Sequence, residues 1–383
     1  MTEAYIHAAL RTPRGKARPD GALAGLTPPG LVAALVEALA GRGHDPRGRA
    51  ERLVLGCVGQ VGAQGGHLAM VSKFHAGLPD NVATQTLNNF CASGLSAIGA
   101  GAAAIVAGQA RWVLAGGVEM MSRVPFMADK ADYYTATDLP PRQRYIQVAL
   151  AADLLATTEG ISRAELDACA LASQQRAAAA ESQPALLASR IAVNGLTREE
   201  TVRPPLDAAR LAALEPAFAA LAEPYAEALE GAALDFRHTV AHAPPMADGA
   251  GLALLGPRDG AIARIVAVAE AGGDPRASLT AGFAAMDQVL ARAGLPLAAM
   301  DRIEFMEAFA VVIAKFLRDR APDPARVNVG GGHLAKGHPM GATGAILLSS
   351  LIDALAACGG RYGLVVATGA QGVGTAMIVE YLQ

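Results

Sequence analysis

Short apolar runs alternate with longer stretches rich in alanine and glycine through most of the chain, and this alternation limits the folds open to it. The apolar runs have no polar face, which is typical of strands buried on both sides. The pattern predicts an α/β protein whose mostly parallel sheets are covered by helices, and it excludes all-α and all-β folds. The expected strands are 4–10, 52–58, 82–87, 112–119, 252–256, 262–270, 302–307, 362–368 and 376–382, and the expected helices are 27–39, 92–108, 280–293 and 341–357.

A polar segment interrupts this alternation in the middle of the chain. Between Met120 and about Arg237 the strand signal disappears, and Ser162 and Glu165 have the spacing of a capping box, which predicts a helix beginning there. The simplest layout is two β/α halves with one insertion. The expected units are a first half at 1–119 completed by 238–257, an inserted loop domain at 120–237 and a second half at 258–383.

Composition excludes several classes of function. The 32 Lys and Arg residues balance 35 Asp and Glu residues to a net charge of −3, so no basic surface for nucleic acid is expected. Four cysteines in 383 residues make no disulfide framework and favour a reduced, cytoplasmic setting. The N-terminal residues lack the pattern of a signal peptide, and no apolar stretch of membrane-spanning length runs uninterrupted, so no membrane partner is expected.

Cys91 is the first candidate for chemistry, because it lies between an apolar run and a nearly all-apolar helix. The N–H groups of a helix N-terminus stabilise a thiolate, so this position predicts a lowered thiol pKa. The small residues at 92–94 are expected to leave room for a ligand near the sulfur. A buried structural cysteine is the alternative. Cys57, Cys169 and Cys358 lack this setting and are expected to serve only in packing.

His338 is the second candidate. It stands in Gly337-His338-Pro339, after a run of three glycines, and Pro339 is expected to open the first turn of the following helix. A histidine at so rigid a position suits a proton acceptor for a thiol, with a helix-capping histidine as the alternative. A phosphate loop is excluded because Gly332 and Gly337 are followed by His333 and His338 rather than by Lys and Ser or Thr. His238 and His242 have no cysteine or acidic ligand pair beside them, so no metal site is expected.

A glycine-rich turn between two apolar strands, at 367–377, is the third candidate. Such a turn can direct backbone N–H groups at a developing oxyanion, although a plain hairpin explains it equally well.

Taken together, these blocks resemble the thiolase family, the acetyl-CoA acetyltransferases and 3-ketoacyl-CoA thiolases. The resemblance extends from end to end and is most specific at two blocks in the family order, Asn88-Asn89-Phe90-Cys91-Ala92-Ser93-Gly94 and Gly337-His338-Pro339. It is supported by three further blocks, Arg11–Lys16, Gly56–Gly62 and Gly116–Ser122.

The resemblance implies a fold of two βαβαβ-type halves that form a five-layered α-β-α-β-α core, with a loop domain that covers coenzyme A. It implies a homodimer or homotetramer that takes acyl-CoA and uses coenzyme A as a co-substrate, with no permanently bound cofactor. The implied role belongs to fatty acid metabolism. Basic residues of the insertion that could meet the coenzyme A phosphates are Arg142, Arg144 and Arg163.

The resemblance also implies roles for single residues. Cys91 would carry the acyl group as a thioester during reversible thiolysis or Claisen condensation. His338 would take the thiol proton and then, beside Gly337, line one oxyanion pocket. The backbone N–H groups of Cys91 and Ala370 would line the other pocket.

Three positions depart from the family pattern. Met306 stands where the family has an asparagine that holds a water, and Thr368 stands at the position of the family's acid/base cysteine. Pro244 replaces a serine near the pantetheine chain. The acylation residues are therefore present while the carbon–carbon chemistry is altered. This leaves two alternatives open: an acyl-CoA thioesterase or heteroatom acyltransferase that uses Cys91 and His338, or a non-catalytic acyl-CoA-binding subunit.

Overall fold

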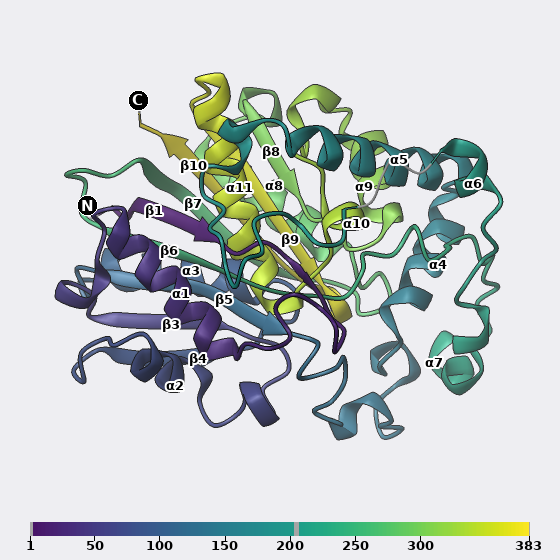
Figure 1. Ribbon diagram of the computed structural model, residues 1–383. Coiled ribbons are helices and arrows are strands. Elements are labelled where there is room, and N and C mark those ends of the chain that lie inside the picture. The colour runs from purple at the N-terminus through teal and green to yellow at the C-terminus, as the bar shows by residue number, and fades with distance from the viewer. Residues whose placement is uncertain (1–2, 203–206, 383) are drawn as a thin grey trace.

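The computed structural model describes residues 3–202 and 207–382, and its strands form one mixed sheet (Figure 1). The strand order is β4-β3-β5-β6-β1-β7-β10-β9-β8, and β2 pairs with β6 beside this path. The strands are β1 Tyr5–Arg11, β2 Gly15–Lys16, β3 Arg52–Gly56, β4 Ala83–Leu87, β5 Val113–Met120, β6 Ala247–Gly256, β7 Ala263–Gly272, β8 Arg302–Phe305, β9 Tyr362–Gly369 and β10 Val373–Tyr381. Every expected strand is present, with ends displaced by at most five residues.

The sheet consists of two half-sheets with a short junction. Strands β1 and β7 pair over only two residues on each side, Tyr5 with Arg264 and Ile6 with Ala263. Helices α3 and α11 lie between the two half-sheets, α1 and α2 cover the outer face of the first, and α8 covers the outer face of the second. The result is the five-layered α-β-α-β-α arrangement. The helices are α1 Pro28–Gly41, α2 Leu68–His75, α3 Ser93–Val106, α4 Val148–Glu159, α5 Arg163–Ala180, α6 Ala208–Ala212, α7 Ala226–Leu229, α8 Ala281–Ala293, α9 Ala310–Arg320, α10 His333–Lys336 and α11 Thr343–Cys358.

Strand direction differs from the expectation of mostly parallel sheets. Strand β3 is parallel to β4 and β5, and β8 is parallel to β9, whereas the other described pairings are antiparallel. The prediction was wrong because a strand that is apolar on both faces indicates only that both faces are buried, and it does not indicate the direction of the neighbouring strands. Here the helix layers provide that burial for antiparallel strands as well.

The central helix α11 explains the most apolar stretch of the chain. Met340–Cys358 is long and apolar enough to cross a membrane by length and composition, yet most of it is buried between the half-sheets. Glycines allow α3 and α11 to approach closely. A Cβ atom on Gly344 would lie 2.6 Å from Cβ of Leu95, and one on Gly94 would lie 2.7 Å from the carbonyl oxygen of Gly341.

The inserted segment lies at one side of the layered core, where α4, α6 and α7 are grouped (Figure 1). Its helices α4 and α5 pack against α9 of the C-terminal half. The capping box is confirmed: Ser162 caps α5 by accepting from the backbone N–H of Glu165, and the Glu165 carboxylate accepts from the backbone N–H of Ser162. Helices α2 and α9 were not among the helices expected from the sequence.

Candidate active site

Cys91 lies in the short connection between β4 and α3. The preceding residue, Phe90, has φ of 45°, a left-handed conformation that is uncommon for a side chain of this size. Ser93 holds the turn, since its hydroxyl accepts from the backbone N–H of Asn89 at 2.8 Å and donates to the carbonyl of Phe90. Gly94, among the small residues after Cys91, makes room for the backbone at Gly341.

The thiol of Cys91 is a neutral group in this setting. Burial raises its pKa to about 12, and the carboxylate of Glu119 acts in the same direction. Two backbone N–H groups, those of Ala370 and of Cys91 itself, favour the thiolate and oppose this shift. The expected lowering of the pKa was wrong, because the loss of hydration outweighs the N–H groups at the helix N-terminus.

The loop that carries His338 is fixed from both sides. Gly337 has φ of 88°, and a Cβ atom there would lie 2.9 Å from Cβ of Ala247, so glycine is required. The backbone N–H of His338 donates to the carbonyl of Pro245 at 2.8 Å. Pro339 does not open α11 itself, because a short 3₁₀ turn at Met340–Ala342 comes before the helix.

The imidazole of His338 has one occupied and one free nitrogen. Its Nδ1 lies 2.8 Å from the hydroxyl of Thr343, and its Nε2 has no hydrogen-bond partner among the described residues. Burial lowers the pKa of His338 to about 3, and the nearby cation of Arg14 adds to the shift. A neutral imidazole with a free nitrogen is the form required of a proton acceptor.

The glycine-rich turn after β9 brings a backbone donor to the thiol. Gly369 ends β9, and Gln371 has φ of 57° and is held by its backbone N–H donating to the Ser278 hydroxyl at 2.8 Å. Between them lies the backbone N–H group of Ala370, which acts to lower the pKa of Cys91. The turn therefore joins β9 to β10 as a hairpin and also directs an N–H group at the candidate nucleophile.

One cavity of about 300 Å³ contains the side chains of Cys91 and His338, and Pro244 also lines it. Thr368 and Met306 do not line it. Both are fully buried, and the hydroxyl of Thr368 has no partner among the described residues. Thr368 packs against α8, because a Cβ atom added to Gly282 of that helix would lie 3.1 Å from the Cβ atom of Thr368. The structure thus brings together Cys91, His338, Pro244 and the Ala370 N–H, and it leaves Thr368 and Met306 in the core.

Glu119 is a supporting residue that the sequence motifs did not single out. It ends β5, and its carboxylate accepts from the backbone N–H groups of Val58 at 2.9 Å, Gly59 at 3.0 Å and Gly341 at 3.0 Å. Gln64 adds a fourth donor at 2.6 Å. The carboxylate therefore joins the end of β3 to the loop that follows His338. Only its place within the 116–122 block could have drawn attention to it.

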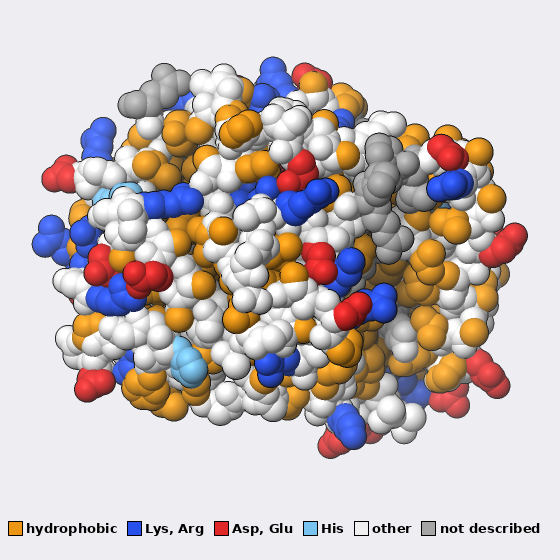
Figure 2. All heavy atoms as spheres, viewed as in Figure 1, with side chains coloured by type: hydrophobic (Ala, Val, Ile, Leu, Met, Phe, Trp, Pro, Cys, Tyr) orange, Lys and Arg blue, Asp and Glu red, His pale blue; other side chains and the backbone are white. Residues whose placement is uncertain are grey.

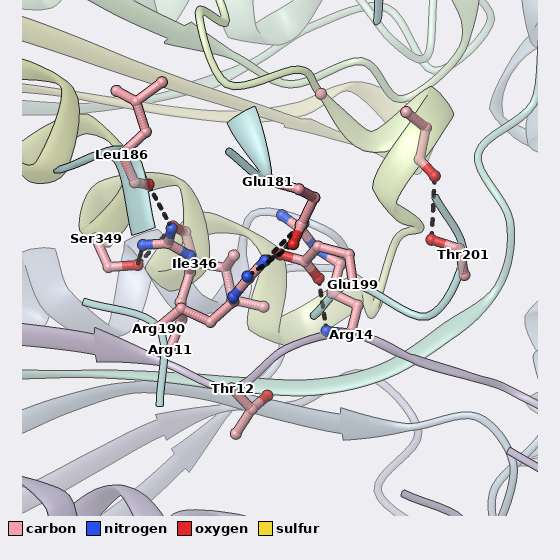
Figure 3. A network of polar contacts seen from close by, with 12 residues as sticks. Arg11, Thr12, Arg14, Glu181, Leu186, Arg190, Glu199, Thr201, Ile346 and Ser349 are labelled. Atoms are coloured by element: carbon pink, nitrogen blue, oxygen red, sulfur yellow. Dashed lines mark hydrogen bonds and ion pairs between the residues drawn. The ribbon is translucent and has the colours of Figure 1, made fainter. Parts of the chain in front are cut away.

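A buried polar network lies behind the histidine loop (Figure 3). Arg14 is paired with Glu199 at 3.3 Å, and the hydroxyl of Thr201 donates to the carbonyl of Ala335 at 3.0 Å. These two contacts connect residues 199–201 to Arg14 after β1 and to Ala335 of α10. The cation of Arg14 is the charged group that acts on His338.

The remaining histidines and cysteines have structural contacts. His238 and His242 lie 2.7 Å from the carboxylates of Asp153 and Asp167, respectively, which belong to α4 and α5. In the part of the chain that the structure describes, no group of three or more His, Cys, Asp and Glu side chains is arranged to hold a metal ion. Cys57 is buried and Cys169 is half-buried, whereas Cys358 is exposed, unlike the expected interior position.

The comparisons with known proteins cover the whole chain. Residues 4–259 match the thiolase N-terminal domain, and residues 260–381 match the thiolase C-terminal domain. A steroid 3-ketoacyl-CoA thiolase of Mycobacterium tuberculosis, FadA6, is 32% identical over 408 residues, covering 100% of this chain and 95% of that protein. A β-ketoadipyl-CoA thiolase of Escherichia coli is 36% identical over 411 residues, covering 99% of this chain and 100% of that protein.

A solved structure extends the similarity to the fold. The acetyl-CoA acetyltransferase of Bacillus anthracis superposes with a TM-score of 0.85 at 28% identity, covering 100% of this chain and 99% of the other. One conclusion follows from three findings: the two domain matches together span nearly all of the sequence, full-length relatives are more than 30% identical, and the five-layered core is shared. The chain belongs to the thiolase family of acyltransferases.

Proposed function

We propose that this chain catalyses the reversible cleavage of 3-ketoacyl-CoA by coenzyme A, through an acyl thioester on Cys91. The observation that carries the proposal is the placement of Cys91 and His338 in one cavity, where the backbone N–H group of Ala370 acts to stabilise the thiolate of Cys91. The names of the relatives, β-ketoadipyl-CoA thiolase and steroid 3-ketoacyl-CoA thiolase, support this reaction class.

In the first half of the reaction, Nε2 of His338 removes the proton of the Cys91 thiol. A neutral imidazole can do so only if its Nδ1 carries the hydrogen, and Nδ1–H then donates to the hydroxyl of Thr343. The sulfur attacks the 3-keto carbon, and the N–H groups of Cys91 and Ala370 stabilise the oxyanion. The bond between C2 and C3 breaks, the proton passes to C2, and acetyl-CoA leaves.

In the second half, coenzyme A replaces the acetyl-CoA product. His338 removes the proton of its thiol, and the sulfur of coenzyme A attacks the acyl thioester on Cys91. The acyl group leaves as acyl-CoA, and Cys91 recovers its proton. Two half-reactions on one nucleophile predict ping-pong kinetics. Coenzyme A is therefore a co-substrate in this proposal.

The proposal includes three units: an N-terminal half at 1–119 that is completed by 238–257, an inserted loop domain at 120–237 and a C-terminal half at 258–383. The inserted domain would cover the bound coenzyme A, and the lining of the cavity supports this. The cavity with Cys91 is lined both by this segment, at Phe218 and Leu221, and by the C-terminal half, at Phe309. A substrate bound there would contact both parts.

A homodimer in the cytoplasm completes the proposal. Strand β4 ends the sheet with only β3 beside it in the described part of the chain, and Met70 and Phe74 on the adjacent α2 are exposed. An unpaired strand edge beside apolar side chains is suited to pairing with a second copy. Sedimentation equilibrium should give 78 kDa, twice the 39.0 kDa of one chain. Twice that again would indicate a tetramer, and 39.0 kDa would contradict the proposal.

The second candidate function is acyl transfer without carbon–carbon cleavage, to water or to another acceptor. The positions of Met306 and Thr368, which do not line the cavity, favour it. Neither side chain is placed to hold a water for the oxyanion or to move the proton of C2. In this case the thiol would attack only the thioester carbonyl of the substrate.

One experiment separates the two functions. The purified protein is mixed with acetoacetyl-CoA without free coenzyme A, and its intact mass is recorded beside that of Cys91→Ala. An acetyl group on the wild-type protein alone would show that the carbon–carbon bond was cut. An acetoacetyl group would show attack at the thioester and would favour the second candidate. No adduct on Cys91 would contradict both.

A further inference from the structure

Gln371 has an uncommon backbone conformation close to the candidate nucleophile. Its φ of 57° lies in the left-handed region, which disfavours a residue with a Cβ atom. The turn that contains it approaches the Cys91 loop closely, since a Cβ atom on Gly369 would lie 3.2 Å from the backbone nitrogen of Cys91. The residue before Gln371 is Ala370, whose N–H group favours the thiolate of Cys91. The conformation at Gln371 therefore bears directly on the direction of that N–H group.

The layered core holds the backbone of this turn from one side. The N–H group of Gln371 donates to the hydroxyl of Ser278 at 2.8 Å, and the N–H group of Gly372 donates to the carbonyl of Ser278 at 3.2 Å. The N–H group of Gly273 donates to the carbonyl of Gly372 at 2.8 Å. Ser278 and Gly273 belong to the connection between β7 and α8. These bonds use only the backbone of residues 371 and 372, so they do not require a glutamine.

The side chain of Gln371 extends to the inserted segment on the other side of the turn. Its Oε1 accepts from the hydroxyl of Tyr133 at 3.1 Å, and its Nε2 donates to the carbonyl of Ile146 at 3.3 Å. The Tyr133 hydroxyl also lies 2.9 Å from the carbonyl of Gln143, so its one hydrogen is shared between two acceptors. Both ends of the Gln371 amide are thus bound to the stretch 133–146, and each end has a partner of the complementary kind.

This amide connects two parts of the molecule that otherwise meet around a cavity. The cavity is lined by Cys91 and His338 from the core and by Gln147 and Val148 from the inserted segment. On the face shown in Figure 2, the surface is hollowed where the layered core meets the inserted segment, and hydrophobic side chains gather there. Apolar contacts are not directional, whereas hydrogen bonds are. The hydrogen bonds of Gln371 can therefore fix the orientation of the turn, which apolar packing alone does not.

We propose that the side chains of Gln371 and Tyr133 form a clamp that positions the Ala370 N–H group for the acylation of Cys91. Gln371 and Tyr133 are positioning residues in this proposal, because they act through the turn and do not touch the reacting atoms. The inference rests on the proposed function, in which the Ala370 N–H group stabilises the oxyanion. It applies to both candidate reactions, since each begins with attack of the Cys91 sulfur on a carbonyl carbon. The clamp also makes the alignment of this donor depend on the position of the inserted segment.

The rate of Cys91 acylation by acetoacetyl-CoA tests the clamp. Gln371→Gly and Gln371→Asn both tolerate the left-handed conformation, but neither side chain is long enough to bind Tyr133 and Ile146. The maximal rate should fall about tenfold in both variants, because a misdirected donor loses part of the effect of a complete oxyanion donor, about 10²–10³-fold. The half-saturating concentration of acetoacetyl-CoA should change less than about threefold. An unchanged maximal rate, or a change confined to the half-saturating concentration, would overturn the inference.

A matched pair of tyrosine variants locates the effect in the clamp. Tyr133→Phe removes the hydroxyl that binds Gln371 and should slow acylation about threefold or more. Tyr134→Phe removes a neighbouring hydroxyl that donates to the carboxylate of Asp129 at 2.9 Å, and it should leave the rate unchanged. In Gln371→Gly/Tyr133→Phe the rate should be close to that of Gln371→Gly, because both side chains act through one contact. Multiplied losses in the double variant, or equal slowing by Tyr134→Phe, would contradict the clamp.

A second measurement separates the clamp from the reaction itself. Iodoacetamide alkylates the thiolate form of a cysteine, and the Ala370 N–H group favours the thiolate of Cys91. The rate of Cys91 alkylation, followed by peptide mass spectrometry, should therefore fall about threefold or more in Gln371→Gly. Slowed alkylation in this variant, with no acylation in the wild type, would contradict the proposed function alone. Acylation and alkylation at wild-type rates in Gln371→Gly would contradict the clamp alone.

Discussion

Two physical effects act on the thiol of Cys91 in opposite directions. The N–H groups of Ala370 and Cys91 favour the thiolate, and burial together with Glu119 disfavours it more strongly, so that the pKa rises to about 12. His338, with a pKa lowered to about 3, is equally uncharged at neutral pH. The resting site therefore holds a neutral thiol and a neutral imidazole, and the proton moves only when a substrate carbonyl is in place.

This resting state can be measured. Because the thiol pKa is about 12, the thiolate absorbance in the ultraviolet should not differ between the wild-type protein and Cys91→Ala from about pH 6 to about pH 9. Because His338 remains unprotonated down to about pH 3, protonation of this group should not slow acylation between about pH 8 and about pH 5. A thiolate that titrates below about pH 8 in the wild type alone would contradict this prediction.

Thr343 is a positioning residue for His338. Its hydroxyl lies 2.8 Å from Nδ1, and in the proposed reaction it accepts the Nδ1 hydrogen, which leaves Nε2 as the acceptor nitrogen. Thr343→Val removes the partner while preserving the shape of the side chain, so the rate of acylation by acetoacetyl-CoA should fall about tenfold or more. Thr343→Ser, which keeps the hydroxyl, should retain most of the rate. Equal rates in both variants would show that the contact does not orient the imidazole.

At the scale of the secondary-structure elements, Glu119 joins β5, the end of β3 and the loop after His338. Each carboxylate oxygen accepts two N–H donors, so Glu119→Gln would replace one acceptor by an NH₂ group that faces N–H donors. The free energy of unfolding should fall by about 2–4 kcal/mol, and acylation should slow because the loop at Gly341 loses its anchor. Urea titration and the acylation rate measure the two effects.

The matched control is Glu215→Gln on the exposed surface of the insertion, which should change neither quantity. A loss below about 1 kcal/mol in Glu119→Gln would show that the four hydrogen bonds do not hold these elements together.

The sequence predicted the individual helices and strands better than it predicted how they are arranged and which residues of different elements contact each other. Local signals such as the capping box of Ser162 and Glu165 depend on residues three apart, and they were confirmed. Strand direction, the raised pKa of Cys91 and the role of Glu119 depend on neighbours supplied by distant parts of the chain. The partners of Glu119, for example, come from residues 58–64 and 341, and no local pattern could have brought them together.

Segments that are far apart in the sequence are also joined by a buried ion pair, and the contribution of this pair to the stability of the whole molecule can be measured. Arg11 ends β1 and is paired with Asp353 of α11 at 2.7 Å, with both side chains almost completely buried. The inserted segment joins this pair. Ser189 donates its N–H and hydroxyl groups to Asp353. The carbonyl of Leu186 accepts from Arg11 at 3.0 Å (Figure 3). One buried ion pair thus contacts the first half, the central helix and the insertion.

Removing one partner should cost more than removing both. In Asp353→Leu the guanidinium of Arg11 is left buried without its carboxylate. The free energy of unfolding, measured by urea titration, should therefore fall by about 3–5 kcal/mol. In Arg11→Met/Asp353→Leu no charge remains, so most of that loss should be recovered. Limited proteolysis between residues 181 and 200 should increase in the single variant and return towards the wild-type rate in the double variant, because Ser189 and Leu186 are held by the same pair. If the double variant were as unstable as the single one, the three parts would be held together by apolar packing and backbone hydrogen bonds rather than by this ion pair.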